Sequence, residues 1–364
     1  MQSNSIGFIF ISLFQVEPSY HGASDISLNF FKLWPSKNKS LIQISKKKND
    51  RNKTISIKKR NNLFGVFYNL LLISFHSKKK LNNYKKKVAI IEGASWAGYS
   101  FILICILKLA IKDCKIIYHA HNLEYEVRKF KNSSLIKFLT FYFEKYIYKY
   151  SIGTTVSNKD QKFVKKNYRS ESILFENGVK EESPKKLKKI SLLKNKFILF
   201  TGSYTYWPNK IAVENIFKNK AIIKKKLKNI KFVFTGEGFP SHNDKDVINL
   251  NIVKKQELVW LIKNCLFFYA PLPKAPGTKI KILEAIFYGS TLVCSNYSLV
   301  GIKNLDKLNF VFKIKGENIS KLIKYIESKK YKSLLKNNKT FKKHYNFKFK
   351  VENFYDKLFN KKYL

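Results

Sequence analysis

Residues 267–289 read FFYAPLPKAPGTKIKILEAIFYG, a stretch that combines a short apolar strand, a glycine loop and a helix. The strand is expected to end at Pro271, and the helix is expected to begin near Thr278. Gly289 then supplies a natural C-terminal cap for that helix. A strand followed at once by a loop and a helix is typical of an open α/β sheet.

The start of this helix has the chemistry of a phosphate site. A helix N-terminus presents unpaired N–H groups and partial positive charge, and Gly277 lets the backbone come close to a ligand. Lys279 and Lys281 add positive charge there. Glu284 follows one to two turns later, where an acidic residue suits the paired hydroxyls of a ribose. The alternative is an ordinary strand–loop–helix whose Glu284 faces solvent.

The same alternation of strands and helices extends in both directions along the chain. Uninterrupted β-branched runs between helices indicate parallel strands covered on both faces. The predicted strands lie at residues 6–14, 87–92, 115–119, 151–156, 197–201, 231–235, 267–271 and 292–295. The predicted helices lie at residues 25–33, 98–111, 134–150, 208–217, 280–288 and 345–364.

A polar, lysine-rich break at residues 180–190 divides this pattern into two halves of similar size. We predict an N-terminal Rossmann-like domain over residues 1–180 and a second one over residues 181–345, with a terminal helix at residues 346–364. Residues 46–87 are lysine-rich and irregular, and their elements are left unassigned.

Composition limits the class of protein. The chain has 364 residues, of which 45% are hydrophobic, so global disorder is excluded. Lys and Arg total 71 against 24 Asp and Glu, which gives a net charge of +47, yet only four residues are Arg. Because Lys, Asn, Ile, Phe and Tyr share A/T-rich codons, genome composition explains much of this charge. The remainder suits anionic partners. Four cysteines without a CxxC pair argue against a disulfide framework or a zinc site.

The sequence predicts neither a secretory signal nor a transmembrane helix, which favours a cytoplasmic protein. Lysine clusters fall within the N-terminal half, at residues 46–48, 58–60, 78–80 and 85–87. Two interpretations stay open for them. They are solvated surface lysines, or they dock the N-terminal domain peripherally onto anionic membrane at its inner face.

Further motifs occur in a definite order: HAHNLEYE at 119–126, TTVSNKD at 154–160, FENGV at 175–179, FTGSYTYWPN at 200–209 and FVFTGEG at 232–238. Together with residues 271–293 they resemble glycosyltransferase family 4, the retaining GT-B group. The resemblance implies a GT-B fold, in which two Rossmann-like domains face each other across a cleft. It also implies that the C-terminal helix packs back on the N-terminal domain.

The resemblance also implies roles for individual residues. His121 matches the histidine that contacts the donor sugar better than His119, which is expected to pack at the strand end. The family often has a first glutamate eight positions before the second, and here Pro276 stands in that place. The predicted catalytic residues are His121, Lys281 and Glu284, the predicted donor-binding residues are Gly277, Thr278, Lys279, Gly202 and Asn209, and Gly22 and Ala23 form the acceptor or sugar loop.

The main functional hypothesis is a retaining, metal-independent glycosyltransferase. It would move a sugar from a nucleotide diphosphate to a glycan or lipid-linked acceptor in the synthesis of cell-surface polysaccharide or lipopolysaccharide. No cofactor and no specific nucleic acid are expected. Asp244 and Asp246 have the spacing of a metal-binding pair but are interpreted as a solvated loop. The alternatives are a non-catalytic basic protein that binds nucleic acid or anionic membrane, a sugar-nucleotide epimerase, and a transferase that has lost activity.

Overall fold

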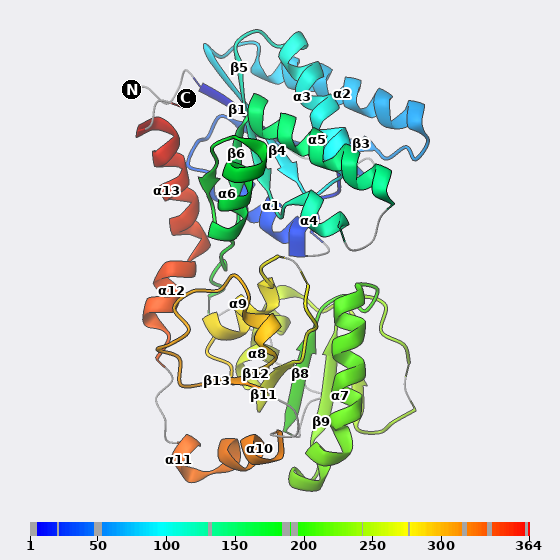
Figure 1. The fold of residues 1–364 in the computed structure, drawn as a ribbon, viewed down its shortest axis with the longest axis vertical. Helices are drawn as coiled ribbons and strands as arrows, with labels where there is room; N and C mark the ends of the chain where they lie inside the picture. Colours follow the sequence, from blue (N-terminus) through cyan, green and yellow to red (C-terminus); the bar gives the residue numbers. More distant parts are fainter. Residues whose placement is uncertain are drawn as a thin grey trace. The chain divides into compact units, whose positions relative to one another are not determined.

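A computed structural model describes residues 6–19, 22–46, 53–129, 133–183, 190, 196–241, 243–275, 277–314, 319–332, 337–360 and 363–364 (Figure 1). The chain forms two compact units. Unit 1 consists of residues 1–177 together with residues 348–364, and unit 2 consists of residues 178–347.

Within the described residues, unit 1 is built on a seven-stranded parallel sheet with the strand order β3-β2-β1-β4-β5-β6-β7. Its first strand is fully buried, as expected for the centre of a parallel sheet. The order reverses between β1 and β4, which are neighbours in the sheet. The strands are β1 (Ile6–Ser12), β2 (Lys39–Ser45), β3 (Thr54–Lys58), β4 (Lys86–Gly93), β5 (Cys114–Ala120), β6 (Ile152–Thr155) and β7 (Ile173–Leu174).

Helices connect these strands, and local signals set several of their ends. The Asn62 side chain caps α2 by accepting a hydrogen bond from the backbone N–H of Gly65 at 2.8 Å. The Ser133 hydroxyl caps α5 in the same way. The helices of unit 1 are α1 (Gly22–Leu33), α2 (Leu63–Leu81), α3 (Ala97–Ala110), α4 (Glu124–Arg128), α5 (Ser134–Tyr150), α6 (Asn158–Phe163), a π-helical turn (Val164–Tyr168) and most of α13 (Phe347–Asn360).

Unit 2 repeats the design with a six-stranded parallel sheet over its described residues, in the order β10-β9-β8-β11-β12-β13. Its order reverses between β8 and β11. The strands are β8 (Phe197–Thr201), β9 (Lys231–Thr235), β10 (Val247–Asn249), β11 (Phe267–Ala270), β12 (Leu292–Cys294) and β13 (Val311–Lys313). The helices are α7 (Trp207–Lys226), α8 (Lys255–Asn264), α9 (Ile280–Phe287), a 3₁₀ turn (Asn296–Leu299), α10 (Ile319–Glu327), α11 (Lys329–Lys332) and α12 (Lys339–Tyr345).

The elements predicted from the sequence are present, and two corrections arise. The unassigned region 46–87 contains a strand, β3, and a 19-residue helix, α2. The terminal helix predicted at residues 345–364 is α13, and a separate helix that was not predicted, α12, precedes it and ends one residue before Asn346. Among the residues described, no helix combines the length and the apolar character needed to cross a membrane.

The terminal helix α13 completes the core of unit 1, as predicted. Its Phe354 ring lies 4.8 Å from the Phe175 ring and 6.1 Å from the Phe30 ring. Trp34 contacts both Phe354 and Tyr355 of the same helix. The last residues of the chain therefore fill a space beside the first strand rather than extending unit 2.

Replacing Phe354 by Ala tests this packing. Removing a buried phenyl ring leaves a cavity, so the unfolding free energy of unit 1 should fall by about 3–5 kcal/mol. The measurement is native-state hydrogen exchange of the β1 amides, which lie in the same core. The half-exposed Phe349 on the same helix provides the matched control, and Phe349→Ala should change the exchange much less. Equal effects of the two variants would contradict the assignment of α13 to this core.

Candidate active site

In unit 2 the candidate site lies where the strand order reverses, at the carboxyl ends of β8 and β11. This edge is the usual ligand position in a doubly wound sheet. The Lys281 ammonium on α9 donates a hydrogen bond of 2.6 Å to Asn209 Oδ1 in the first turn of α7. Asn209 in turn donates from Nδ2 to the Ser203 carbonyl oxygen at 2.7 Å. Lys281 is thus held between the helices that follow the two central strands.

Glycines make this close approach possible. Gly202 ends β8 with φ +133°, and a Cβ atom there would lie 2.4 Å from Lys281 Nζ. Gly236 follows β9 with φ +141°, and a Cβ atom there would lie 2.2 Å from the Gly202 carbonyl oxygen. Neither position accommodates a larger residue without movement of its neighbours. The role of Gly202 in this structure is to leave room for the lysine.

The environment of Lys281 favours the neutral amine over the charged ammonium. Burial lowers the pKa of the Lys281 ammonium to about 7, although the negative charge of Glu284 acts in the opposite direction. Its Nζ also lies 4.4 Å from the centre of the Phe200 ring. A bound anion would favour the charged ammonium, so this lysine is suited to bind a phosphate and to take up a proton as it does so.

Glu284 is buried one turn further along α9, and its carboxylate pairs with the Lys255 ammonium at the start of α8. The sequence reasoning missed Lys255, because nothing local distinguishes it from the other lysines of the chain. A buried carboxylate with one cationic partner still has lone pairs for further hydrogen bonds. Glu284 therefore keeps the capacity to accept bonds from a diol.

The loop before α9 holds the other predicted donor-binding residues. Gly277 adopts φ +78°, in the left-handed region. Thr278 lies against Gly301, where a Cβ atom would come within 2.8 Å of Thr278 Oγ1. The Lys279 ammonium donates to the Ala275 carbonyl oxygen at 2.7 Å, and burial lowers the pKa of Lys279 to about 8. Lys279 thus closes its own loop. Pro276 lies outside the described residues.

Asp244 and Asp246 do not belong to this site. They precede β10, so they lie at the amino ends of the strands, whereas the candidate site lies at the carboxyl ends. The expectation of a solvated loop is wrong for Asp246, which is buried and pairs with Lys224 and Lys231. Asp244 pairs with Lys220. Both carboxylates therefore form ion pairs with lysines.

In unit 1, a buried polar cluster forms at the carboxyl ends of β4 and β5. Glu92 Oε2 accepts hydrogen bonds from His119 Nδ1 at 2.9 Å, from His121 Nε2 at 2.8 Å and from the Ser27 hydroxyl at 2.7 Å. Strand register places Glu92 beside Ser12 on one side and His119 on the other. The sequence reasoning selected His121 but missed Glu92, whose signal was a carboxylate at the end of an otherwise apolar strand.

Electrostatics reinforce this cluster. Burial by itself raises the pKa of the Glu92 carboxyl, but the charge of His119 and the hydrogen bonds from both histidines outweigh that effect and hold the pKa well below its usual range. The same three side chains offer one ligand atom each within 4.8 Å of one another, which is a donor set that suits a metal ion. Hydrogen bonding already accounts for the three atoms, because each histidine nitrogen lies within 3 Å of the carboxylate.

A second buried carboxylate anchors the segment that follows His121. Glu144 on α5 accepts hydrogen bonds from the backbone N–H groups of Glu124 and Tyr125, at 2.7 and 3.1 Å, and from the Tyr168 hydroxyl at 2.7 Å. Burial raises the pKa of Glu144 to about 7, despite these hydrogen bonds. Glu144 thereby fixes the start of α4, three residues after the predicted catalytic histidine.

Gly22 and Ala23 form the first turn of α1, five and four residues before Ser27. Gly22 is exposed, and a Cβ atom there would meet nothing within 4 Å. Gly22 and Ala23 therefore belong to the same helix as Ser27, whose hydroxyl donates a hydrogen bond to Glu92. The two residues that precede Gly22 lie outside the described residues.

Comparisons with known proteins give structural matches alone. No family model matches the sequence, and no curated protein matches it. The structure is similar to sucrose-phosphate synthase from Thermosynechococcus elongatus, with a TM-score of 0.70 and 12% identity over 98% of this chain and 99% of that one. It is also similar to Anabaena HepE in complex with UDP-glucose, with a TM-score of 0.69 and 11% identity over 97% and 99%.

A third similar structure is WaaG, a glycosyltransferase involved in lipopolysaccharide biosynthesis, with a TM-score of 0.58 and 13% identity over 96% of this chain and 95% of that one. These likenesses extend over nearly the whole of each chain. Together with the two parallel sheets, they show that the chain has the GT-B fold.

Replacing Glu92 by Gln tests the unit 1 cluster. Removing the charge leaves two buried histidines without their carboxylate, which should cost roughly 3–5 kcal/mol of stability. Because the pKa of Glu92 is depressed in the folded protein, its contribution is complete above the ordinary value of 4.5 and is lost as the pH falls from there toward the depressed pKa.

The measurement is thermal unfolding of both proteins between about pH 2.5 and pH 7, a range that extends well below the ordinary pKa of 4.5. The difference in stability should be largest at neutral pH and should shrink at the acidic end. Glu171→Gln, at an exposed ion pair with Lys165, is the control and should change stability little at any pH. A difference between wild type and Glu92→Gln that does not vary with pH would contradict the ionised state of Glu92.

Proposed function

We propose that this protein is a retaining glycosyltransferase that takes a sugar from a nucleotide diphosphate. The observation that carries the proposal is the position of Lys281, held by Asn209 at the strand-order reversal of unit 2, with Glu284 buried three residues further along the same helix. A cation for the diphosphate and a carboxylate for the ribose are the two groups that nucleotide recognition needs at this edge.

The structural comparisons support the same class of substrate. HepE has been solved with UDP-glucose, and WaaG is described as a glycosyltransferase of lipopolysaccharide biosynthesis. We propose that this chain also uses a nucleotide sugar as donor and a glycan or lipid-linked glycan as acceptor. The reaction would take place in the cytoplasm and would serve the synthesis of a cell-surface polysaccharide. Membership of glycosyltransferase family 4 and retention of the anomeric configuration rest on the sequence resemblance.

The proposed chemistry is electrostatic. As the bond to the anomeric carbon breaks, negative charge develops on the leaving diphosphate, and donors held in place beforehand lower the barrier most effectively. Lys281 and the start of α9 would supply that positive charge, so we propose that no metal ion is required. His121, held by Glu92, is the residue we assign to the donor sugar, following the family pattern.

Replacing Glu284 by Ala tests the donor site. Loss of a carboxylate that accepts bonds from ribose should weaken UDP, GDP or ADP binding by roughly 1–3 kcal/mol, which is about 5- to 150-fold in Kd. The measurement is calorimetry in EDTA, so that a metal-dependent site would reveal itself by a failure of the wild type to bind. The exposed Glu214→Ala in the same unit is the control and should bind normally.

A 2′,3′-dideoxy nucleotide sharpens this test. In the wild type, removing the two ribose hydroxyls from the nucleotide should weaken binding about as much as the Glu284→Ala substitution does. The Glu284→Ala variant should bind the dideoxy analogue about as well as it binds the normal nucleotide. Independent, additive losses would show that Glu284 acts on some other part of the ligand.

Binding of a nucleotide diphosphate is also expected to change the protonation of Lys281. With a pKa of about 7 in the free protein, Lys281 is mostly neutral at pH 8, and the bound diphosphate should restore its charge. Binding of UDP at pH 8 should therefore take up nearly one proton, and binding at pH 6 should take up very little at Lys281. Calorimetry in two buffers of different ionisation enthalpy measures this number.

Lys281→Arg is the matched control for proton uptake. Arginine stays charged at both pH values, so the uptake at pH 8 should disappear even if the affinity changes. The same uptake in the Arg variant and the wild type would assign the titration to another group.

A further inference from the structure

Helix α2 in unit 1 has several polar residues on its buried face and large apolar residues on its exposed face, which is the reverse of an ordinary surface helix. Its buried face includes Gly65, Asn69, Ser74 and Ser77 beside a few aliphatic residues. Its exposed face is more apolar, since Phe64 is 85% exposed and Phe75 is 63% exposed. The exposed residues Phe64, Phe67, Tyr68, Leu71 and Phe75 recur at intervals of three and four, so they form one stripe along the helix.

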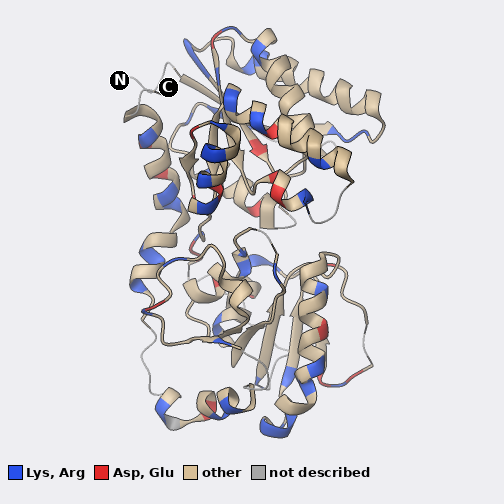
Figure 2. Ribbon diagram, in the orientation of Figure 1, with Lys and Arg blue, Asp and Glu red and all other residues tan. Residues whose placement is uncertain are grey.

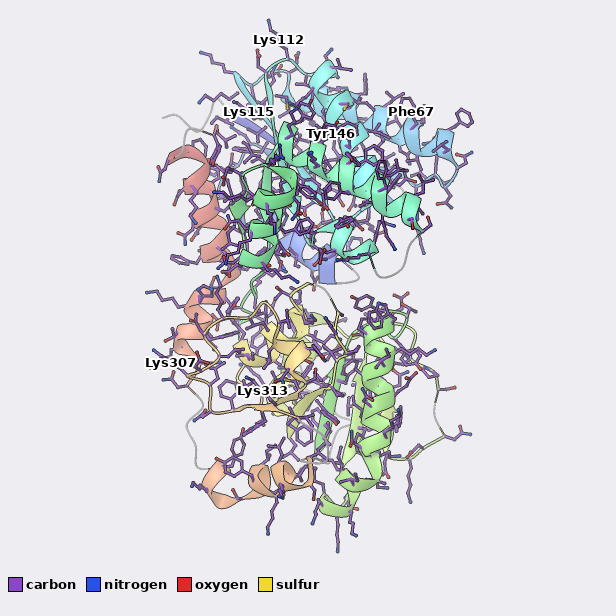
Figure 3. The ribbon with its side chains drawn as sticks, viewed as in Figure 1. Phe67, Lys112, Lys115, Tyr146, Lys307 and Lys313 are labelled. Atoms are coloured by element: carbon purple, nitrogen blue, oxygen red, sulfur yellow. The ribbon has the colours of Figure 1, made fainter. Side chains whose placement is uncertain are left out.

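The two neighbouring helices also carry exposed apolar residues. Helix α3 packs against both α2 and α5, so the three helices form one layer. Leu109 is the most exposed large apolar residue of α3. On α5 the exposed large apolar residues are Leu135, Phe138, Tyr142, Tyr146 and Tyr150, again at intervals of three and four. Figure 3 shows Phe67 pointing away from α2 and labels Tyr146 on α5. We call these exposed residues of α2, α3 and α5 the aromatic face.

The exposed charge on these three helices has a single sign. The three helices contain one acidic residue, Glu144, and its side chain is buried. They contain seven lysines: Lys78, Lys79, Lys80, Lys108, Lys137, Lys145 and Lys149. Arg60 lies just before α2 and packs over the Tyr68 ring at 4.4 Å. Figure 2 shows basic residues in this region of unit 1 and helices that are otherwise largely uncharged.

We propose that the aromatic face docks on the surface of an anionic lipid bilayer. Phenylalanine and leucine side chains suit the boundary between headgroups and acyl chains, tyrosines suit the headgroup level, and lysines around them suit anionic lipid. The buried face of α2 stays packed on β1, β2 and β3, so the helix would lie flat in the interface. The inference does not depend on the activity proposed above.

Charge complementarity selects this occupant over two others. A second copy of the chain would bring the same lysines together with no exposed carboxylate on these helices to pair with them. Nucleic acid would satisfy the lysines but offers no apolar surface for a stripe of phenylalanine and leucine. An anionic bilayer satisfies both the charge and the apolar residues.

The experiment is co-sedimentation of the full-length protein with vesicles of phosphatidylcholine alone or with 30% phosphatidylglycerol, without nucleotide. The wild type should bind the anionic vesicles at least about tenfold more strongly, and 0.5 M salt should remove much of that preference. Two variants of the aromatic face, Phe64→Ser/Phe67→Ser and Lys78→Glu/Lys79→Glu, should each lose about tenfold or more in vesicle binding.

Matched pairs in unit 2 serve as controls. Ile222→Ser/Ile252→Ser removes two exposed apolar residues, and Lys225→Glu/Lys226→Glu reverses two exposed lysines in the last turn of α7. Both should bind anionic vesicles like the wild type. All four variants should retain the wild-type affinity for UDP, so a failed donor site and a failed docking face are distinguished.

Two results would overturn the proposal. One is equal vesicle binding by the aromatic-face variants and the unit 2 controls, which would show that net charge alone attracts the protein to lipid. The other is a concentration-dependent dimer in light scattering that Phe64→Ser/Phe67→Ser abolishes, which would assign the face to a second copy of the chain.

Discussion

Parallel pairing of the strands is the constraint on which the rest of the structure depends. Each paired strand in the described parts of both sheets runs in the same direction as its neighbour, so the carboxyl ends of the strands lie along one edge of each sheet. That alignment brings Glu92 and His119 into one register row, and it brings the loop after β8 close to the helix after β11. Glu92 lies 27 residues from His119 and Lys281 lies 72 residues from Asn209, and the sheet topology makes these pairs neighbours.

Buried acidic residues are a second feature that holds the polar clusters in place. The chain has 24 acidic residues against 71 basic ones, and of the glutamates that the structure describes, those at positions 92, 144 and 284 are buried. The partners of Glu92 are two histidines and a serine, and those of Glu144 are two backbone N–H groups and a tyrosine. The partner of Glu284 is Lys255. Because these carboxylates are internal, they hold loops and site residues in place and leave the surface more basic than the composition indicates.

Sequence reasoning predicted the alternation of elements well, because buried parallel strands are short apolar runs between helices. Residues 197–201, 231–235 and 134–150 have the predicted bounds. It failed at α2, because the apolar residues of that helix lie on its exposed face and therefore give no amphipathic signal that points to a core. Lys281 and Glu284 were found because they share one helix, whereas Lys255 and Glu92 were missed because their partners lie 29 and 27 residues away. The assigned roles of these side chains remain predictions.

The placement of α13 has a consequence for how the protein is made. The first part of unit 1 leaves the ribosome before unit 2, but the helix that fills the space beside Phe30, Trp34 and Phe175 is synthesised only after the whole of unit 2. Unit 2 is contiguous in the sequence and separates the two parts of unit 1. The N-terminal unit therefore reaches its final packing only after unit 2 has been synthesised, and until then Phe30, Trp34 and Phe175 lack their contacts with α13, so a chaperone that shields these rings would assist folding.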